Sequence, residues 1–255
     1  LFLVSSQAAL LDTTPLAIIS RPVPHLSNTG SFDLVVCPEL FISGYGSSIN
    51  INKYSETSDG EFAKKISNLA KKFSTAIIYG YPEIDNNQLF NSAQLFSNDG
   101  LSIANHRKKL LPPTAEESKI FTPGKESSIF SIKGIKSAIV ICYELEFPEL
   151  IRELALQGVE FRIETTGQSS LWPAAALHHG ITRACENGIL VAYANSTGDL
   201  NGISFMGESK IIGPDGLDLA NAGIGEKIIA AKIDTDKISC VREKLPYLKD
   251  SESLQ

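Results

Sequence analysis

The sequence predicts an α/β protein built as a layered sandwich of sheets and helices. Apolar runs of strand length recur along the 255 residues and alternate with helical patterns. Compact turn signals at Asn98-Asp99-Gly100 and Pro214-Asp215-Gly216 join other extended segments as hairpins. Because βα units and hairpins occur together, a plain doubly wound parallel sheet is excluded.

Seven apolar runs are predicted to be strands, and an eighth is predicted at the N-terminus. The segment Leu1 to Leu11 has no charged region before it and is too short to cross a bilayer, so we expect a first strand there. No linker, repeat or low-complexity stretch divides the chain, which predicts a single domain over residues 1–255. The other predicted strands are 33–37, 75–79, 94–96, 137–141, 188–193, 209–212 and 227–233.

Three segments are predicted to be helices. Residues 61–73 place Phe62, Ile66 and other apolar side chains on one face, and lysines on the opposite face. Residues 148–157 begin with a proline and are followed by Gly158, as is typical of helix ends. Residues 174–187 form the third, which we expect Gly188 to terminate.

The composition is that of an ordinary globular protein with a net charge of −6. A nucleic-acid partner is therefore not expected, because the longest basic cluster spans only residues 106–109. The four cysteines are widely spaced and form no CxxC pair, so we expect reduced thiols in the cytoplasm and no structural zinc. The four histidines show no metal-ligand spacing, and no metal, organic cofactor or membrane partner is predicted.

Cys142 stands where an apolar run breaks into a polar turn and then a helix. Such a junction exposes one side chain at a sheet edge, and the N–H groups of the turn favour negative charge beside it. A thiol there can attack a carbonyl whose oxygen those donors stabilise. A lone cysteine in a strand is more often a small core residue, so the prediction that Cys142 is a nucleophile needs partners elsewhere in the chain.

Three other segments place titratable residues near strand ends or in loops. Glu39 follows the strand 33–37, and partial desolvation there would raise its pKa towards that of a base. The segment 106–112 contains two lysines, either of which could stabilise an oxyanion. The segment 116–124 contains Glu116 and Glu117 before a Pro-Gly turn. Each segment also has an ordinary structural interpretation. Glu39 could cap a helix, the two lysines could be solvated in a loop, and Glu116 and Glu117 could be exposed acids.

Taken together, these segments resemble the nitrilase superfamily, the carbon-nitrogen hydrolases. The matching segments follow the family order over roughly residues 31–235. They are Pro38-Glu39-Leu40-Phe41 with Gly44-Tyr45, Arg107-Lys108-Lys109-Leu110-Leu111-Pro112, Ile141-Cys142-Tyr143-Glu144 with Phe147-Pro148-Glu149, Arg183-Ala184-Cys185-Glu186-Asn187, and Gly207-Glu208-Ser209-Lys210 with Pro214-Asp215-Gly216.

The resemblance implies a catalytic set and a fold. Glu39 would be the general base, Lys108 the oxyanion stabiliser and Cys142 the nucleophile, with Glu117 as the second glutamate. Lys109 and Glu116 are the neighbouring alternatives. The backbone N–H of Tyr143 would complete the oxyanion site, and Tyr45 would contact the substrate. The implied fold is a four-layer α-β-β-α sandwich, with two mixed sheets flanked by helices and the layers doubled on dimerisation.

The implied function is an amidase that converts a small amide to its carboxylic acid and ammonia through a Cys142 thioester. The partners expected are that small-molecule substrate and a second copy of the chain, in a homodimer or higher oligomer. An N-carbamoyl amine hydrolase, an ω-amidase and a deaminated-glutathione amidase share the same residues. A nitrile-hydrolysing member is disfavoured because Tyr143, and not tryptophan, follows the cysteine.

Two hypotheses come from other classes. A catalytically silent scaffold of the same fold would have lost a residue of the set, whereas this chain keeps all of them. A Cys-His thiol protease would need His178 or His179 within hydrogen-bond reach of Cys142.

Two stretches depart from the family pattern. Residues 12–28 contain three prolines where a long helix is expected. In the stretch that starts at Phe161, where the family usually has an apolar strand, Arg162 and Glu164 alternate with apolar residues, which predicts an ion pair on one face or an unusually polar pocket. Because this region contributes to substrate selection in the family, the specificity of a relative is not carried over.

Overall fold

The computed structural model describes residues 2–7, 32–46, 51–200 and 202–253. Within them the chain forms two six-stranded sheets and a separate two-stranded ribbon. The predicted N-terminal strand is present over Phe2–Gln7. The expectation of a proline-broken helix over residues 12–28 lies outside the described residues.

The first sheet has the strand order β14-β1-β2-β3-β4-β5. Strand β2 is parallel to both β1 and β3, and the other pairs are antiparallel. The predicted turn at residues 98–100 joins β4 to β5, so that hairpin is confirmed. The bounds are β1 (Phe2–Gln7), β2 (Leu34–Val36), β3 (Ala76–Asp85), β4 (Gln88–Phe96), β5 (Ser102–Arg107) and β14 (Lys227–Lys232).

The second sheet has the order β13-β12-β9-β8-β7-β6. Its central strand β8 is parallel to β7 and β9, and its outer pairs are antiparallel. Both sheets are therefore mixed, as expected. The bounds are β6 (Ile129–Ile132), β7 (Ile135–Ile141), β8 (Phe161–Thr166), β9 (Leu190–Asn195), β12 (Lys210–Ile212) and β13 (Asp218–Asn221), with β10 (Thr197–Leu200) and β11 (Ile203–Met206) forming the ribbon.

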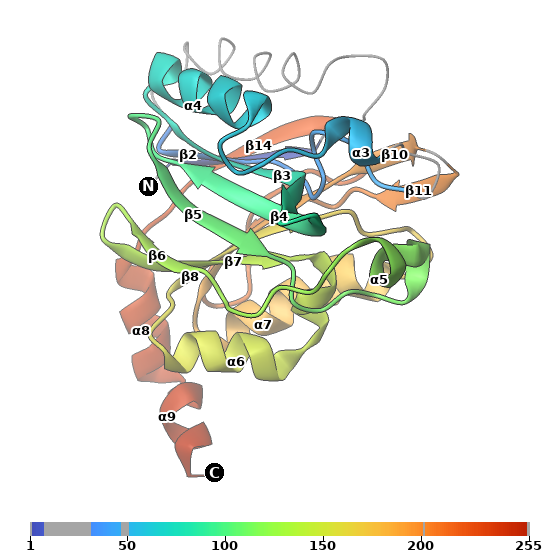
Figure 1. The fold of residues 1–255 in the computed structure, drawn as a ribbon. Coiled ribbons are helices and arrows are strands. Elements are labelled where there is room, and N and C mark those ends of the chain that lie inside the picture. Colours follow the sequence, from blue (N-terminus) through green and yellow to red (C-terminus); the bar gives the residue numbers. More distant parts are fainter. Residues whose placement is uncertain (1, 8–31, 47–50, 201, 254–255) are drawn as a thin grey trace.

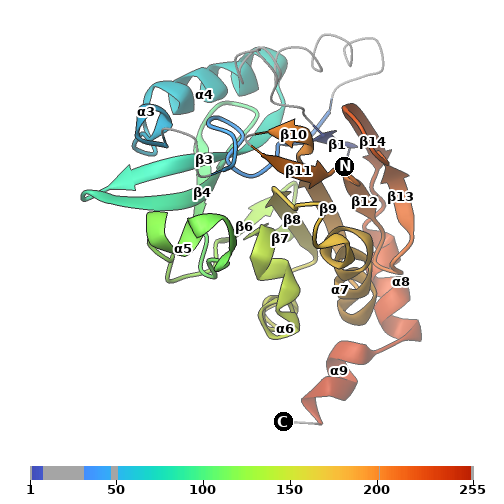
Figure 2. The same ribbon diagram turned by 90° about the vertical axis from the view of Figure 1, so that its right-hand side faces the viewer.

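The two sheets face each other and helices cover their outer faces, which gives four layers within one chain (Figures 1 and 2). Alternate residues of the strands point into the space between the sheets, where Val36, Ile78, Ile139 and Ile163 share one apolar core. On the far side of the first sheet, Val35 and Ile77 pack with residues of helix α4 (Glu61–Phe73). Helices α6 (Pro148–Leu156) and α7 (Gly180–Asn187) cover the other sheet in the same way. The α-β-β-α prediction is confirmed.

The helix predictions hold, with one difference. The helix at residues 61–73 is confirmed, and α6 ends one residue before the predicted Gln157. The third predicted helix begins with a π-helical turn at Ala175–His179 and becomes α-helical only as α7. Gly188 ends α7 with a φ of 56°, a left-handed conformation that glycine adopts readily. The remaining helices are α3 (Ile51–Tyr54), α5 (Glu117–Ile120), α8 (Asp236–Lys244) and α9 (Tyr247–Glu252).

No described helix combines the length and the apolar character that a bilayer span requires.

The loops that follow β2, β5 and β7 contact one another at one edge of the two sheets. The N–H of Glu39, just beyond β2, donates to the carbonyl of Thr166 at the end of β8. This bond joins the first sheet to the second at the carboxyl ends of their central strands. Ligand sites in α/β folds form at such strand ends.

Candidate active site

Cys142 occupies a sharp turn directly after β7 and begins a 3-10 helix that runs to Glu146. Its φ is 47°, a left-handed conformation that is uncommon for a residue with a side chain. The residue is partly exposed, and its thiol forms no disulfide. The backbone N–H of Tyr143 lies in the first turn of this helix, where such groups have no intrahelical acceptor. The turn therefore presents a thiol and a free donor together.

Glu39 lies on the turn after β2 and is almost fully buried. Leu40 next to it has a φ of 46°, so this turn too is left-handed. Strand β3 comes very close at Gly80, where a Cβ atom would lie 2.4 Å from the nitrogen of Leu40 and 2.7 Å from the carbonyl oxygen of Pro38. Only glycine allows this approach. The Glu39 carboxylate is in turn fixed by the N–H of Gly167, which donates to its Oε2 at 2.8 Å.

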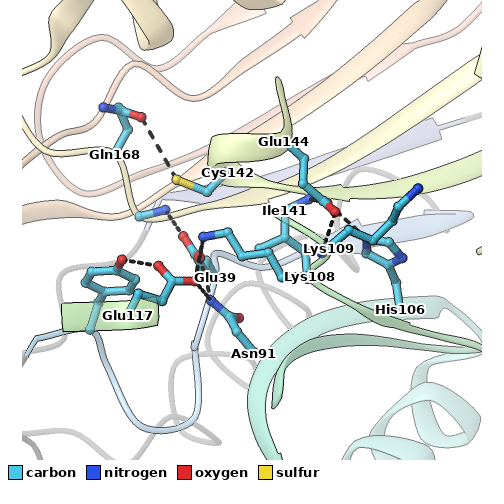
Figure 3. Close-up of polar contacts among 12 residues, drawn as sticks. Glu39, Asn91, His106, Lys108, Lys109, Glu117, Ile141, Cys142, Glu144 and Gln168 are labelled. Atoms are coloured by element: carbon cyan, nitrogen blue, oxygen red, sulfur yellow. Dashed lines mark hydrogen bonds and ion pairs between the residues drawn. The ribbon is translucent and has the colours of Figure 1, made fainter. Parts of the chain in front are cut away.

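Lys108 follows β5 and is completely buried, with its ammonium group between two carboxylates (Figure 3). Its Nζ lies 2.7 Å from Oε1 of Glu39 and 2.8 Å from Oε1 of Glu117. The neighbouring Lys109 instead donates its Nζ to the hydroxyl of Ser127 at 3.1 Å. Of the two lysines that the sequence left open, Lys108 is therefore the one that lies with the glutamates.

Glu117 begins the short helix α5 and is buried, whereas Glu116 is exposed and pairs with Lys119. The second carboxylate oxygen of Glu117 accepts a very short hydrogen bond from the hydroxyl of Tyr45. Tyr45, predicted to contact substrate, thus holds this glutamate with its hydroxyl. The structure places Glu39, Lys108 and Glu117 in one connected cluster.

Asn91 on β4 completes the cluster, and the sequence interpretation missed it. Its Nδ2 donates to Oε1 of Glu39 at 2.7 Å and to Oε1 of Glu117 at 2.9 Å. The main-chain carbonyl oxygen of Asn91 also accepts the main-chain N–H of Lys108 at 2.8 Å. The available signal was a polar run, Asn91, Ser92 and Gln94, inside a strand that is otherwise apolar.

Burial and neighbouring charges shift the pKa values of Glu39, Lys108 and Cys142. Burial raises the pKa of Glu39, and the nearby Lys108 and Asn91 only partly offset this. Burial lowers the pKa of Lys108, but Glu117 and Glu39 outweigh it, so the net pKa lies well above the usual value and the side chain is an ammonium ion. Burial and the Glu39 carboxylate raise the pKa of Cys142, against a smaller lowering by Lys108. Cys142 is therefore a thiol at neutral pH, and the site also contains a carboxylate, Glu39, whose pKa is raised.

Glu144, two residues after Cys142, connects the turn at Cys142 to the end of strand β5, which Lys108 follows. Its carboxylate accepts the N–H of Ile141 at 2.7 Å, the N–H of Lys109 at 2.8 Å and a hydrogen bond with Nε2 of His106 at 2.9 Å (Figure 3). Burial raises the pKa of Glu144, but His106 and these N–H groups outweigh it, and the net pKa lies below the usual value. This buried acid was not singled out from the sequence.

A family model for carbon-nitrogen hydrolases matches residues 18–243. The chain belongs to the carbon-nitrogen hydrolase family. A hydrolase encoded in the pqqF 5' region of Pseudomonas protegens is 36% identical over 86% of this chain and 77% of its own length. The 2-oxoglutaramate amidase of Bacillus subtilis is 33% identical over 86% of this chain and 84% of its own.

The fold comparison agrees with the sequence comparison. The crystal structure of Saccharomyces cerevisiae Nit3, a member of branch 10 of the nitrilase superfamily, superposes with a TM-score of 0.86. It is 27% identical and covers 96% of this chain and 94% of its own. The resemblance to the amidase-like branch of this superfamily is therefore confirmed, and with it the cysteine-dependent hydrolase class.

A cavity of about 790 Å³ opens onto Cys142 of this carbon-nitrogen hydrolase. Tyr45 and Tyr143, the two predicted contact residues, both line it. Gln168, just beyond β8, also lines the cavity, and its Oε1 lies 3.9 Å from Sγ of Cys142. The volume is within the range typical of small-molecule sites.

The structure shows no histidine among the described hydrogen-bond partners of Cys142. His106 pairs with Glu144. His178 and His179 lie on the π-helical turn, and neither is among the described residues that line the cavity. Within the described part of the chain, no group of three His, Cys, Asp or Glu side chains could hold a metal ion. The geometry therefore favours the glutamate and lysine partners over a Cys-His pair.

The alternation at Arg162 and Glu164 produces the ion pair that was one of the two expectations. Both side chains are fully buried, and Nη2 of Arg162 lies 3.3 Å from Oε2 of Glu164. The pair points towards helix α7, since a Cβ on Gly180 would lie 3.9 Å from that same nitrogen. It does not line the cavity at Cys142, which Gly167 and Gln168 from the same stretch do.

Proposed function

We propose that this carbon-nitrogen hydrolase is an amidase that hydrolyses a small amide to a carboxylic acid and ammonia. The observation that carries the proposal is the position of the Lys108 ammonium, 2.7 Å from Glu39 and 2.8 Å from Glu117, beside the cavity that Cys142 lines. A base, a fixed positive charge and a nucleophile are the groups that attack on an amide requires.

In the first half of the reaction, Cys142 attacks the amide carbonyl carbon. As the C–S bond forms, the thiol proton passes to the Glu39 carboxylate. The carbonyl oxygen becomes an oxyanion next to the Lys108 ammonium and the N–H of Tyr143. The intermediate collapses when the C–N bond breaks, and the proton on Glu39 moves to the departing nitrogen. Ammonia leaves, and a thioester remains on Cys142.

In the second half, water hydrolyses the thioester. The water oxygen attacks the carbonyl carbon while Glu39 takes a proton from the water. The same oxyanion donors stabilise the second tetrahedral intermediate. The C–S bond then breaks, the sulfur regains a proton, and the carboxylic acid leaves. The raised pKa of Glu39 suits a group that must both accept and return a proton.

Glu117 and Asn91 position these groups. Glu117 balances the charge of Lys108 and is itself fixed by Tyr45. Asn91 donates one amide group to both glutamates, which fixes the distance between them. Holding reacting groups in place in this way contributes to rate without transferring a proton.

The test is ammonia release from a panel of small amides, N-carbamoyl amino acids, dicarboxylic monoamides and nitriles. Dicarboxylic monoamides belong on the panel because the Bacillus subtilis relative is named a 2-oxoglutaramate amidase. We expect amides to be hydrolysed, and Cys142→Ala to release no ammonia above the uncatalysed rate. Equal release by the two proteins would contradict the proposal.

The same panel also tests the hypothesis, raised from the sequence, of a catalytically silent scaffold. A silent protein would release no ammonia from any member. Retention of the whole set, Glu39, Lys108, Glu117 and Cys142, favours the enzyme. The homodimer stays a prediction, which light scattering of the purified full chain measures directly.

A further inference from the structure

The cavity at Cys142 has one charged residue among the described residues that line it, and that residue is Glu146. Within the same part of the chain, the lining contains no lysine and no arginine. Lys108 lies behind the cavity, fully buried and held between its two carboxylates. Among the described lining residues, Glu146 is therefore the charged side chain that a substrate group beyond the amide can reach.

The main chain of Glu146 is held in place, whereas its carboxylate has no hydrogen-bond or ion-pair partner among the described residues. It ends the 3-10 helix that Cys142 begins, so the two residues share one short rigid turn. The carbonyl oxygen of Glu146 accepts Nη2 of Arg183 at 3.3 Å, and the carbonyl of Leu145 accepts Nε of the same arginine at 3.2 Å. The Glu146 carboxylate itself makes no hydrogen bond or ion pair with another described residue. It is partly buried, so a cation placed beside it is screened less than at an open surface.

The rest of the lining is largely apolar. Tyr45, Leu171, Trp172 and Ile203 contribute hydrocarbon and aromatic surface, and Trp172 is 61% exposed. A 3-10 helix rises about 2 Å per residue, so Glu146 stands about 8 Å along the axis from Cys142. A chain of a few methylene groups spans that distance and would contact this surface.

We propose that the substrate of this enzyme is an amide that also carries a cationic group, an ammonium, joined by a short hydrocarbon chain and paired with Glu146. The inference rests on the proposed amidase function and adds the substrate class to it. A carboxylate in the same place would meet Glu146 without a compensating cation, and like charges at close range disfavour binding. A neutral amide of the same length would bind through its hydrocarbon alone.

The test compares three amides of matched length. They are 5-aminopentanamide, which is cationic, pentanamide, which is neutral, and glutaramate, the monoamide of glutaric acid, which is anionic. We expect kcat/KM for 5-aminopentanamide to exceed that for pentanamide by about tenfold or more, and glutaramate to be the poorest of the three.

Two variants test whether Glu146 causes this order of kcat/KM values. Glu146→Gln keeps the shape and removes the charge, so the ratio of kcat/KM for 5-aminopentanamide to kcat/KM for pentanamide should fall to about one. Glu146→Lys should reverse the order and favour glutaramate. Glu149→Gln is the matched control, because Glu149 is exposed in the first turn of α6 and does not line the cavity.

The outcomes distinguish failure of the cationic-substrate inference from failure of the proposed amidase function. Turnover of all three amides at similar kcat/KM, or a preference for glutaramate in the unaltered protein, overturns the inference and leaves the amidase standing. A cation preference that Glu146→Gln does not change also overturns it. Absence of Cys142-dependent ammonia release from every amide contradicts the amidase function itself.

Discussion

The carboxylate of Glu144 accepts the main-chain N–H of Lys109 at 2.8 Å. This one bond connects the turn that carries the candidate nucleophile to the strand end that carries the candidate oxyanion stabiliser. The same carboxylate accepts the N–H of Ile141, the residue before Cys142. The relative position of the thiol and the ammonium group therefore depends on a side chain that touches neither substrate nor reacting atom.

Replacing Glu144 with glutamine should lower kcat while leaving KM nearly unchanged. Glutamine has one acceptor oxygen, so its NH₂ group would face a main-chain donor, and a buried N–H would lose its partner. Leaving such a group unpaired costs about 1–3 kcal/mol, which should appear as a lower free energy of unfolding in a denaturant titration. Glu149→Gln is the exposed control. A Glu144→Gln enzyme with an unchanged kcat would show that the bond does not position the site.

Lys108 and its neighbour Lys109 provide a matched pair of variants. Lys108→Met removes the ammonium group between Glu39 and Glu117, and we expect kcat to fall by about 10² to 10³, the usual loss of an oxyanion donor. Lys109→Met removes only a contact with Ser127 and keeps the main-chain bond to Glu144, so kcat should stay close to that of the unaltered protein. Steady-state ammonia release measures both. Loss of activity in the Lys109 variant alone would contradict the assignment.

Glu164 should make the protein less stable as the pH rises from 5 to 8. Burial raises the pKa of Glu164 to about 8, and Arg162 only partly offsets this. Below pH 8 the folded state then binds a proton that the unfolded state releases near pH 4.5, and the contact with Arg162 becomes an ion pair only as the pH rises past the folded pKa. The free energy of unfolding therefore falls across this interval. The contribution of this group is at most about 1.4 kcal/mol per pH unit.

The variant Glu164→Gln tests that slope. Glutamine does not titrate, so the slope of unfolding free energy against pH should flatten in the variant and persist in the Glu149→Gln control. Denaturant titrations at pH 5, 6, 7 and 8 provide the comparison. Parallel curves for Glu164→Gln and the unaltered protein would show that this carboxyl group is already ionised in the folded state across this range, as it is in the unfolded chain.

Gly80→Ala should disturb the turn that carries Glu39. The added methyl group would overlap the backbone of Leu40 and Pro38, which cannot rotate away as a flexible side chain can. Overpacking of this kind costs about 1–3 kcal/mol of stability, and the displaced turn would carry Glu39 away from Lys108. Circular dichroism melting and ammonia release measure the two effects. Unchanged stability and activity would mean that the turn moves freely.

The sequence predicted the parts of this protein that local pattern determines. The helix at residues 61–73 follows from its apolar face, and the hairpin between β4 and β5 follows from its turn residues. The three short strands β6, β10 and β11 were not predicted, because each has only four residues and carries little periodicity. The π-helical turn at Ala175–His179 has no distinct local signal in a run that also suits an α-helix.

The candidate site was predicted to the extent that its residues stand in recognisable segments. Glu39, Lys108, Glu117 and Cys142 each lie in one, and the choice of Lys108 over Lys109 agrees with the contacts of its ammonium group. The carboxylate partners of Asn91 lie 26 and 52 residues away in the sequence. The partners of Glu144 include Ile141, 3 residues away, and His106, 38 residues away. Only the folded arrangement brings these partners together, so the polar run around Asn91 marks an unusual strand but does not indicate what Asn91 contacts.

The central claim is that Cys142 carries the acyl group during turnover. Acid quenching of the enzyme within its first turnovers of an amide substrate, followed by intact-mass and peptide mass spectrometry, measures this directly. We predict a mass increase equal to the acyl group on the peptide that contains Cys142, and none on those that contain Cys37, Cys185 or Cys240. Turnover that continues in Cys142→Ala, or an acyl group found on another residue, would contradict the account.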